Sequence, residues 1–195
     1  MPDITTPHVS GLDIYHGDIV DSFHDAYDAG TRFCFIKATQ GAGYVDPGYL
    51  ENYTRAKSVG MLVGAYLFYD PQADPLDQAS HFLHTANPAK GDLLPVIDIE
   101  TFGPSVGPKA FQCAGAIKKV IGRLPIIYSG DAFYQSYLKN VFQNFTLWIA
   151  RYGAKPVTPC QFWQFSESAR MAGAPLPLDS DVFFGTPADL QQYVL

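Results

Sequence analysis

Two acids two positions apart, Asp98 and Glu100, end an apolar run that begins at Leu93. Successive side chains of a β-strand point to opposite faces, so these acids are predicted to share one face while Ile97 and Ile99 share the other. Burying two acids costs free energy unless they are paired, protonated or used. Glycosidic hydrolysis uses such a pair, one carboxyl as proton donor and the other to stabilise positive charge in the transition state. The spacing therefore favours a glycoside hydrolase.

Short apolar segments alternate with helical segments along the chain, which is typical of a parallel sheet covered by helices. Eight such strands suggest a closed barrel, but a full (β/α)8 barrel typically needs about 250 residues, and this chain has 195. We expect a single α/β domain over residues 1–195, a compact, irregular (β/α)8-like barrel with a reduced set of helices. The expected strands are 9–15, 32–39, 61–69, 93–100, 125–129, 145–152, 160–165 and 177–184, and the expected helices are 19–29, 48–58, 75–85, 109–122, 132–138 and 187–193.

The working residues of such barrels lie at the C-terminal ends of the strands. A single acid at the end of a strand often does no more than cap a loop. Here, however, all eight predicted strands are expected to contribute a polar side chain at the same end of the barrel. This convergence favours a functional site. Lys37 is predicted to face the barrel interior because Phe33 and Phe35 share its face. The aromatic side chains among the candidates are equally compatible with sugar binding and with core packing. The candidates are Asp13, Lys37, Tyr66, Asp98, Glu100, Tyr128, Trp148, Gln164 and Asp179.

Composition narrows the function classes. The net charge is −6 and no run of Lys or Arg occurs, which argues against nucleic acid and anionic membrane surfaces as partners. Three scattered cysteines, Cys34, Cys113 and Cys160, are too few for a disulfide framework or a zinc site, so we expect no metal and no cofactor. Residues 1–7 lack the features of a secretory signal, and no apolar run reaches the ~18 residues of a membrane span.

The order of several short motifs resembles that of glycoside hydrolase family 25, the Chalaropsis-type N-acetylmuramidases. The resemblance covers nearly the whole chain. It departs from the family at Gln40, where Glu is common, at Leu67, where His is common, and in the segment after His16. The matching segments are Gly11–Ile14, Phe35–Gly41, Tyr44–Pro47, Val63–Tyr66, Leu94–Glu100, Ile127–Tyr128, Leu147–Ala150, Trp163–Ser166 and Leu178–Phe183.

The resemblance implies cleavage of the β-1,4 bond between N-acetylmuramic acid and N-acetylglucosamine in peptidoglycan. It implies Glu100 as acid/base and Asp98 as its stabilising partner, with Asp13 and Asp179 as further acids of the cleft. We expect like-charge repulsion among these acids to raise at least one carboxyl pKa, so that Glu100 keeps its proton near neutral pH. The substrate's 2-acetamido group favours a retaining, substrate-assisted route, without excluding direct attack by Asp98 or inversion. The expected substrate-binding residues are Lys37, Tyr66, Tyr128, Trp148, Trp163 and Gln164.

Two other functions fit the same residues, namely a barrel glycosidase acting on another N-acetylated glycan such as chitin, and a non-catalytic wall-binding module. Under the favoured interpretation the partner is the peptidoglycan glycan strand and the outcome is antimicrobial wall lysis by a monomer. Synthesis in the cytoplasm without a signal peptide would then require release through a holin pore or export by a secretion system, and an immunity protein would be a further partner.

Overall fold

The computed structural model describes residues 6–195 of the chain. The N-terminal segment in which no secretory signal was predicted, residues 1–7, falls mostly outside the described residues. Among the helices that are described, none combines the length and the apolar character needed to cross a membrane.

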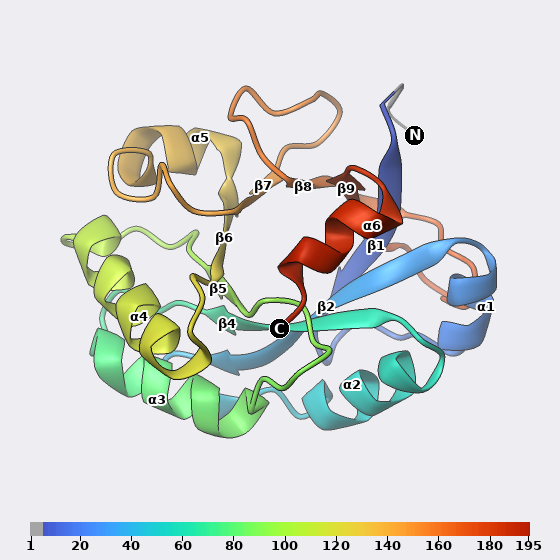
Figure 1. Cartoon of the computed structure of the whole chain (residues 1–195), viewed down its shortest axis with the longest axis horizontal. Coiled ribbons are helices and arrows are strands. Elements are labelled where there is room, and N and C mark those ends of the chain that lie inside the picture. Colours follow the sequence, from blue (N-terminus) through green and yellow to red (C-terminus); the bar gives the residue numbers. More distant parts are fainter. Residues whose placement is uncertain (1–5) are drawn as a thin grey trace.

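Eight strands form a closed barrel, which confirms the predicted architecture (Figure 1). Closure occurs at β1, which pairs with β2 on one side and with β9 on the other. A short ninth strand, β3 (Tyr44–Val45), pairs only with β2, between the predicted strand 32–39 and the predicted helix 48–58, where no element was expected. The barrel strands are β1 (His8–Ile14), β2 (Thr31–Gln40), β4 (Leu62–Phe68), β5 (Val96–Asp98), β6 (Ile126–Gly130), β7 (Leu147–Ala150), β8 (Phe162–Ala169) and β9 (Leu178–Phe184).

The last barrel strand runs against the others. β9 is antiparallel to both β8 and β1, whereas the other neighbouring barrel strands are parallel, as the alternation of strands and helices predicted. An antiparallel pair needs only a hairpin, while a parallel pair needs a crossover of a dozen or more residues. Because the antiparallel strand β9 needs no crossover segment, the barrel can close within 195 residues.

The helices are concentrated in the first two thirds of the chain, and in Figure 1 α1 to α4 line one side of the barrel. No helix joins β7 to β8 or β8 to β9 in the described residues, as the short chain predicted. Helix α3 begins as its sequence indicates, with the Asp74 side chain accepting hydrogen bonds from the first turn and Pro75 in the first position. The helices are α1 (Phe23–Asp28), α2 (Tyr49–Ser58), α3 (Pro75–Ala86), α4 (Val106–Ile121), α5 (Asp131–Phe133), a π-helical turn (Tyr134–Leu138), α6 (Pro187–Leu190) and a 3₁₀ turn (Gln191–Tyr193).

The interior of the barrel is filled with aromatic rings. Phe35 stacks on Trp148 at 4.5 Å between ring centroids, and Phe162 contacts Phe33, Phe35 and Phe183 edge-on or tilted. At the end where β5 begins, α6 and the following turn pack Leu190 and Tyr193 onto this cluster. The backbone N–H of Leu94 donates to the carbonyl of Tyr193 there. The chain thus closes one end of the barrel and leaves the opposite end, where the parallel strands finish, for a site.

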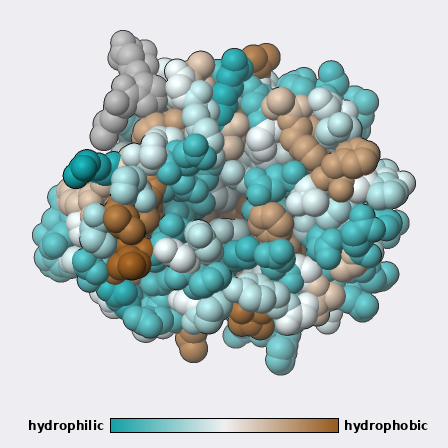
Figure 2. Space-filling model, turned by 180° about the vertical axis from the view of Figure 1, so that it is seen from behind, coloured by the Kyte–Doolittle hydropathy of each residue, from teal (hydrophilic) through white to brown (hydrophobic). Residues whose placement is uncertain are grey.

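The outer surface is mainly polar on the face shown in Figure 2, where hydrophobic residues form small, separate patches. Scattered exposed apolar residues of this kind are normal for a folded domain. This face therefore gives no reason to place a large apolar interface on it.

Candidate active site

A cleft of about 220 Å³ lies at the C-terminal ends of the parallel strands. Nine of the ten residues predicted from the sequence to act in the site line it, and the tenth, Trp163, does not. Tyr15 and Phe68 also line the cleft and were not predicted. The lining residues are Asp13, Tyr15, Lys37, Tyr66, Phe68, Asp98, Glu100, Tyr128, Trp148, Gln164 and Asp179.

Asp98 and Glu100 share the cleft, as their two-residue spacing predicted. Asp98 is the last residue of β5 and is buried, and its Oδ1 has no hydrogen-bond partner among residues 6–195. Strand β5 ends before Glu100, which is the more exposed of the two. Only three residues of the predicted strand 93–100 are assigned to β5, and Pro95, which lacks a backbone N–H, immediately precedes them. The pair therefore combines a deep carboxyl with an accessible one.

Burial is the main cause of the raised pKa values in this pair. It raises the pKa of Asp98 well above its usual range, and the charge of Glu100 adds to this effect while Lys37 opposes it. Burial also raises the pKa of Glu100, again opposed by Lys37. The expected direction is confirmed, but desolvation outweighs the like-charge repulsion that was expected to cause it. A raised pKa keeps a carboxyl protonated at higher pH, as a general acid requires.

Lys37 reaches the cleft from β2, on the strand face that carries Phe33 and Phe35. Its Nζ donates to Oε1 of Gln40 at 2.8 Å and lies 4.5 Å from the ring centroid of Phe68. Gln40 is a neutral acceptor, so this hydrogen bond leaves the charge of Lys37 uncompensated. That charge acts on the two carboxyls of the cleft instead.

The amide of Gln164 connects the acids of the first and last strands. Its Nε2 donates to Oδ2 of Asp13 at 2.7 Å and to Oδ2 of Asp179 at 3.2 Å. Its Oε1 accepts from the hydroxyl groups of Tyr128 at 2.9 Å and Tyr152 at 3.0 Å. The two tyrosine hydroxyl groups hold the amide oxygen in place, so the amide nitrogen, which is the donor of this side chain, faces the two carboxylates. Burial, followed by repulsion from nearby acids, raises the pKa of Asp179 to about 6.

Asp181 is a buried acid of this cluster that was not among the predicted site residues. Its Oδ1 accepts from the indole N–H of Trp148 at 2.7 Å, while its Oδ2 has no donor partner among the described residues. The charges of Asp181 and Asp179 repel that of Asp13 and add to the effect of burial on its pKa. Burial raises the pKa of Asp13 well above its usual range and that of Asp181 to about 8.

The sequence carried a signal for Asp181. Asp179 and Asp181 are two positions apart in a strand, the same spacing that placed Asp98 and Glu100 on one face. Asp181 lies deeper in the barrel than Asp179 and is 1% exposed. It supports the cleft from beneath instead of lining it.

Trp163 faces away from the barrel interior. Its neighbours Phe162 and Gln164 point inward, so the alternation of β8 directs Trp163 outward, where it stacks on Phe184 at 6.1 Å. Its indole N–H donates to the carbonyl of Arg151 at 2.8 Å. This geometry excludes Trp163 from the cleft and gives it a packing role.

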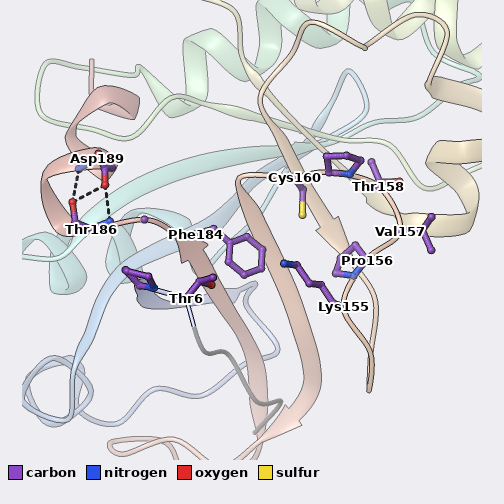
Figure 3. A pocket seen from close by; sticks show the side chains of 12 residues that line it. Thr6, Lys155, Pro156, Val157, Thr158, Cys160, Phe184, Thr186 and Asp189 are labelled. Atoms are coloured by element: carbon purple, nitrogen blue, oxygen red, sulfur yellow. Dashed lines mark hydrogen bonds between the residues drawn. The ribbon is translucent and has the colours of Figure 1, made fainter.

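A second hollow of about 610 Å³ lies between the loop 155–160, the end of β9 and the residues preceding β1 (Figure 3). Lys155 points toward Phe184, with its Nζ 5.0 Å from the ring centroid. The carboxylate of Asp189 accepts a hydrogen bond from the hydroxyl of Thr186 in the N-terminal cap of α6. This hollow contains no pair of acids, so it is not the candidate active site. No set of three or more His, Cys, Asp or Glu side chains within residues 6–195 is arranged to hold a metal ion.

The fold and the cleft together define a class of protein. A barrel closed at one end, with a carboxyl pair where its parallel strands finish, is the architecture of a barrel glycosidase. Residues 12–174 match the sequence profile of "Glycosyl hydrolases family 25". The chain belongs to this family.

Individual relatives agree with this assignment. The chain is 34% identical over 177 residues to "Uncharacterized protein YegX" of Escherichia coli K12, covering 86% of this chain and 65% of YegX. It is 31% identical over 185 residues to the "Autolytic lysozyme" of Clostridium acetobutylicum, covering 90% and 56%. The chain thus spans less than two thirds of either curated relative. The solved bacterial lysozyme of Streptomyces coelicolor is similar with a TM-score of 0.87 and 26% identity, over 95% of this chain and 96% of that one.

Proposed function

We propose that this protein is a peptidoglycan hydrolase that cleaves the β-1,4 bond between N-acetylmuramic acid and N-acetylglucosamine. The observation that carries the proposal is the placement of Asp98 and Glu100 in one cleft at the open end of the barrel. Family membership and the lysozyme names of two similar proteins support it.

In the proposed reaction Glu100 is the general acid. It is the accessible member of the pair, so it can reach the glycosidic oxygen, and burial favours its protonated form. Glu100 gives its proton to the leaving oxygen as the bond from that oxygen to the anomeric carbon breaks. The resulting carboxylate then takes a proton from the water that completes hydrolysis.

Asp98 would act on the acetamido group of the sugar. Its Oδ1 is buried without a partner, and an unpaired buried acceptor gains a hydrogen bond when a ligand brings a donor. The acetamido N–H is such a donor, and this contact would favour the ionised form of Asp98. The acetamido carbonyl oxygen can then attack the anomeric carbon to form a cyclic intermediate, whose positive charge Asp98 stabilises. Water opens this intermediate and the anomeric configuration is retained.

Two other functions use the same cleft. A glycosidase acting on chitin would need the same acetamido chemistry, and a wall-binding module would keep the groove without catalysis. A binding module has no use for two acids placed together in a cleft where burial raises the pKa of both. The pair therefore favours catalysis over binding alone.

The test is digestion of purified peptidoglycan, followed by reduction and mass spectrometry of the fragments. Muramic acid at the new reducing ends is the expected result, while N-acetylglucosamine there would contradict the proposed specificity. Glu100→Gln should lower the rate at least about 100-fold, because general acid catalysis contributes roughly 10²–10⁴. Glu51→Gln, an exposed carboxylate on α2, is the matched control. If Glu100→Gln kept full activity, the assigned mechanism would be wrong.

The proposed substrate places the site of action at the cell wall. Release through a holin pore, export by a secretion system and restraint by an immunity protein remain predictions about partners, as does the monomeric state. Growth of a susceptible strain with the protein directed to its periplasm, compared with cytoplasmic production, would test the site of action. Lysis confined to the periplasmic form is the expected outcome.

A further inference from the structure

A groove of about 790 Å³ continues from the cleft beside Glu100. Its walls come from residues that follow β6 and from the end of β7, including Asp131, Phe133, Gln135 and Arg151. Of the cleft's acids, Glu100 alone lines it, while Asp98, Asp13 and Asp179 do not. A general acid lies beside the leaving oxygen, so a groove on its far side accommodates the leaving-group portion of the substrate.

Asp131 in this groove is fully engaged by its own surroundings. Its Oδ2 accepts from the backbone N–H of Val157 at 2.8 Å and from the guanidinium of Arg151 at 3.0 Å. Its Oδ1 accepts from the backbone N–H and the hydroxyl of Thr158. The carboxylate therefore fastens the loop that follows β7, and its charge is compensated locally.

Arg151, in contrast, has guanidinium N–H groups that are available to a ligand. Only one of its terminal nitrogens bonds to Asp131, and its other side-chain N–H groups make no hydrogen bond within residues 6–195. Its side chain is 38% exposed and lines the groove. A guanidinium held by one carboxylate presents its remaining donors in a fixed fork, a geometry that matches a second carboxylate.

We propose that this groove binds the stem peptide of a muramic acid unit on the leaving-group side, and that Arg151 pairs with a carboxylate of that peptide. The inference rests on the proposed function. In peptidoglycan every second sugar is a muramic acid unit whose lactyl group carries a peptide rich in carboxylates. The groove volume of about 790 Å³ lies within the roughly 300–1,000 Å³ of typical ligand sites, whereas the cleft itself offers about 220 Å³.

The test compares two substrates prepared from one wall sample, peptidoglycan with its stem peptides and the same glycan after an amidase has removed them. The measured quantity is the ratio of kcat/KM on the first substrate to that on the second. Arg151→Gln should lower this ratio about tenfold, the scale of one lost charge-assisted hydrogen bond. Arg151→Lys should lower it less, because lysine keeps the charge and loses the fork. Arg170→Gln, an exposed arginine that does not line the cleft or the groove, is the matched control.

Each other outcome contradicts the inference in a recognisable way. Equal losses on both substrates would mean that Arg151 acts through Asp131 and the loop instead of through the peptide. A larger loss on the stripped glycan would assign Arg151 to the free lactyl carboxylate that amidase exposes. Unchanged rates on both would remove Arg151 from recognition altogether. Failure of the unmodified protein to cleave either substrate would instead contradict the proposed function.

Discussion

Nε2 of Gln164 lies 2.7 Å from Oδ2 of Asp13, although 151 positions separate the two residues in the chain. The contact joins β8 to β1 across the interior of the barrel, at the open end. The neutral amide group of Gln164 lies between two acids, Asp13 and Asp179, and donates a hydrogen bond to each of them. The site therefore depends on an amide whose orientation is fixed by Tyr128 and Tyr152.

Gln164→Glu should destabilise the protein by about 2–4 kcal/mol at pH 7, because it buries a further acid beside two others and removes their shared donor. The loss should be smaller at pH 5, where a protonated carboxyl at position 164 can donate again. Urea unfolding at both pH values measures the effect. Gln112→Glu on the exposed surface of α4 is the control and should change stability little. Equal destabilisation at both pH values would contradict the hydrogen-bonding argument.

The stability of the protein should fall as the pH rises through the neutral range. The folded-state pKa values of Asp179, about 6, and Asp181, about 8, lie above the ordinary value of 3.8, as does that of Asp13. The folded protein thus keeps protons that the unfolded chain has already released. The contribution of these groups is complete below about pH 4 and is lost progressively between about pH 4 and pH 8.

Asp181→Asn should weaken this dependence. Asparagine stays neutral at every pH, so no charge is buried at this position, and its oxygen can still accept from Trp148. We expect the variant to be roughly 1–3 kcal/mol more stable than the parent at pH 8, with a smaller difference at pH 5. Calorimetry at both pH values checks this, with the exposed substitution Asp28→Asn as control. A variant less stable than the parent at pH 8 would contradict the ionisation of buried Asp181 as a cause of the pH dependence.

Lys37→Gln should shift the alkaline limb of the pH–rate profile to higher pH. The charge of Lys37 lowers the pKa of both Asp98 and Glu100, so its removal raises both values and lets Glu100 keep its proton longer. A shift of about half a unit or more is expected for a nearby charge. The profile of kcat/KM on peptidoglycan gives the measurement, and Lys118→Gln on α4 is the control. A shift to lower pH would contradict the assignment of Glu100 as the acid.

Much of the site was predictable because strand alternation is a local property. The spacing of Asp98 and Glu100 placed both in the cleft, and the apolar partners of Lys37 on β2 placed its side chain at the interior. The same rule, applied to β8 and β9, would have directed Trp163 outward and drawn Asp181 into the cluster. Trp163 was expected in the cleft because an aromatic ring suits sugar binding, but its position in β8 directs it away from the cleft.

The eight barrel strands, the shortage of late helices and the acids at the strand ends were predictable without the structure, since they follow from local patterns and chain length. The antiparallel direction of β9 was not predictable from local patterns, because strand direction depends on how the barrel closes. Nor was it predictable that burial, more than mutual repulsion, raises the carboxyl pKa values, since desolvation depends on the packing of distant segments. The spare donors of Arg151 likewise became visible only once Asp131 and its loop lay beside it.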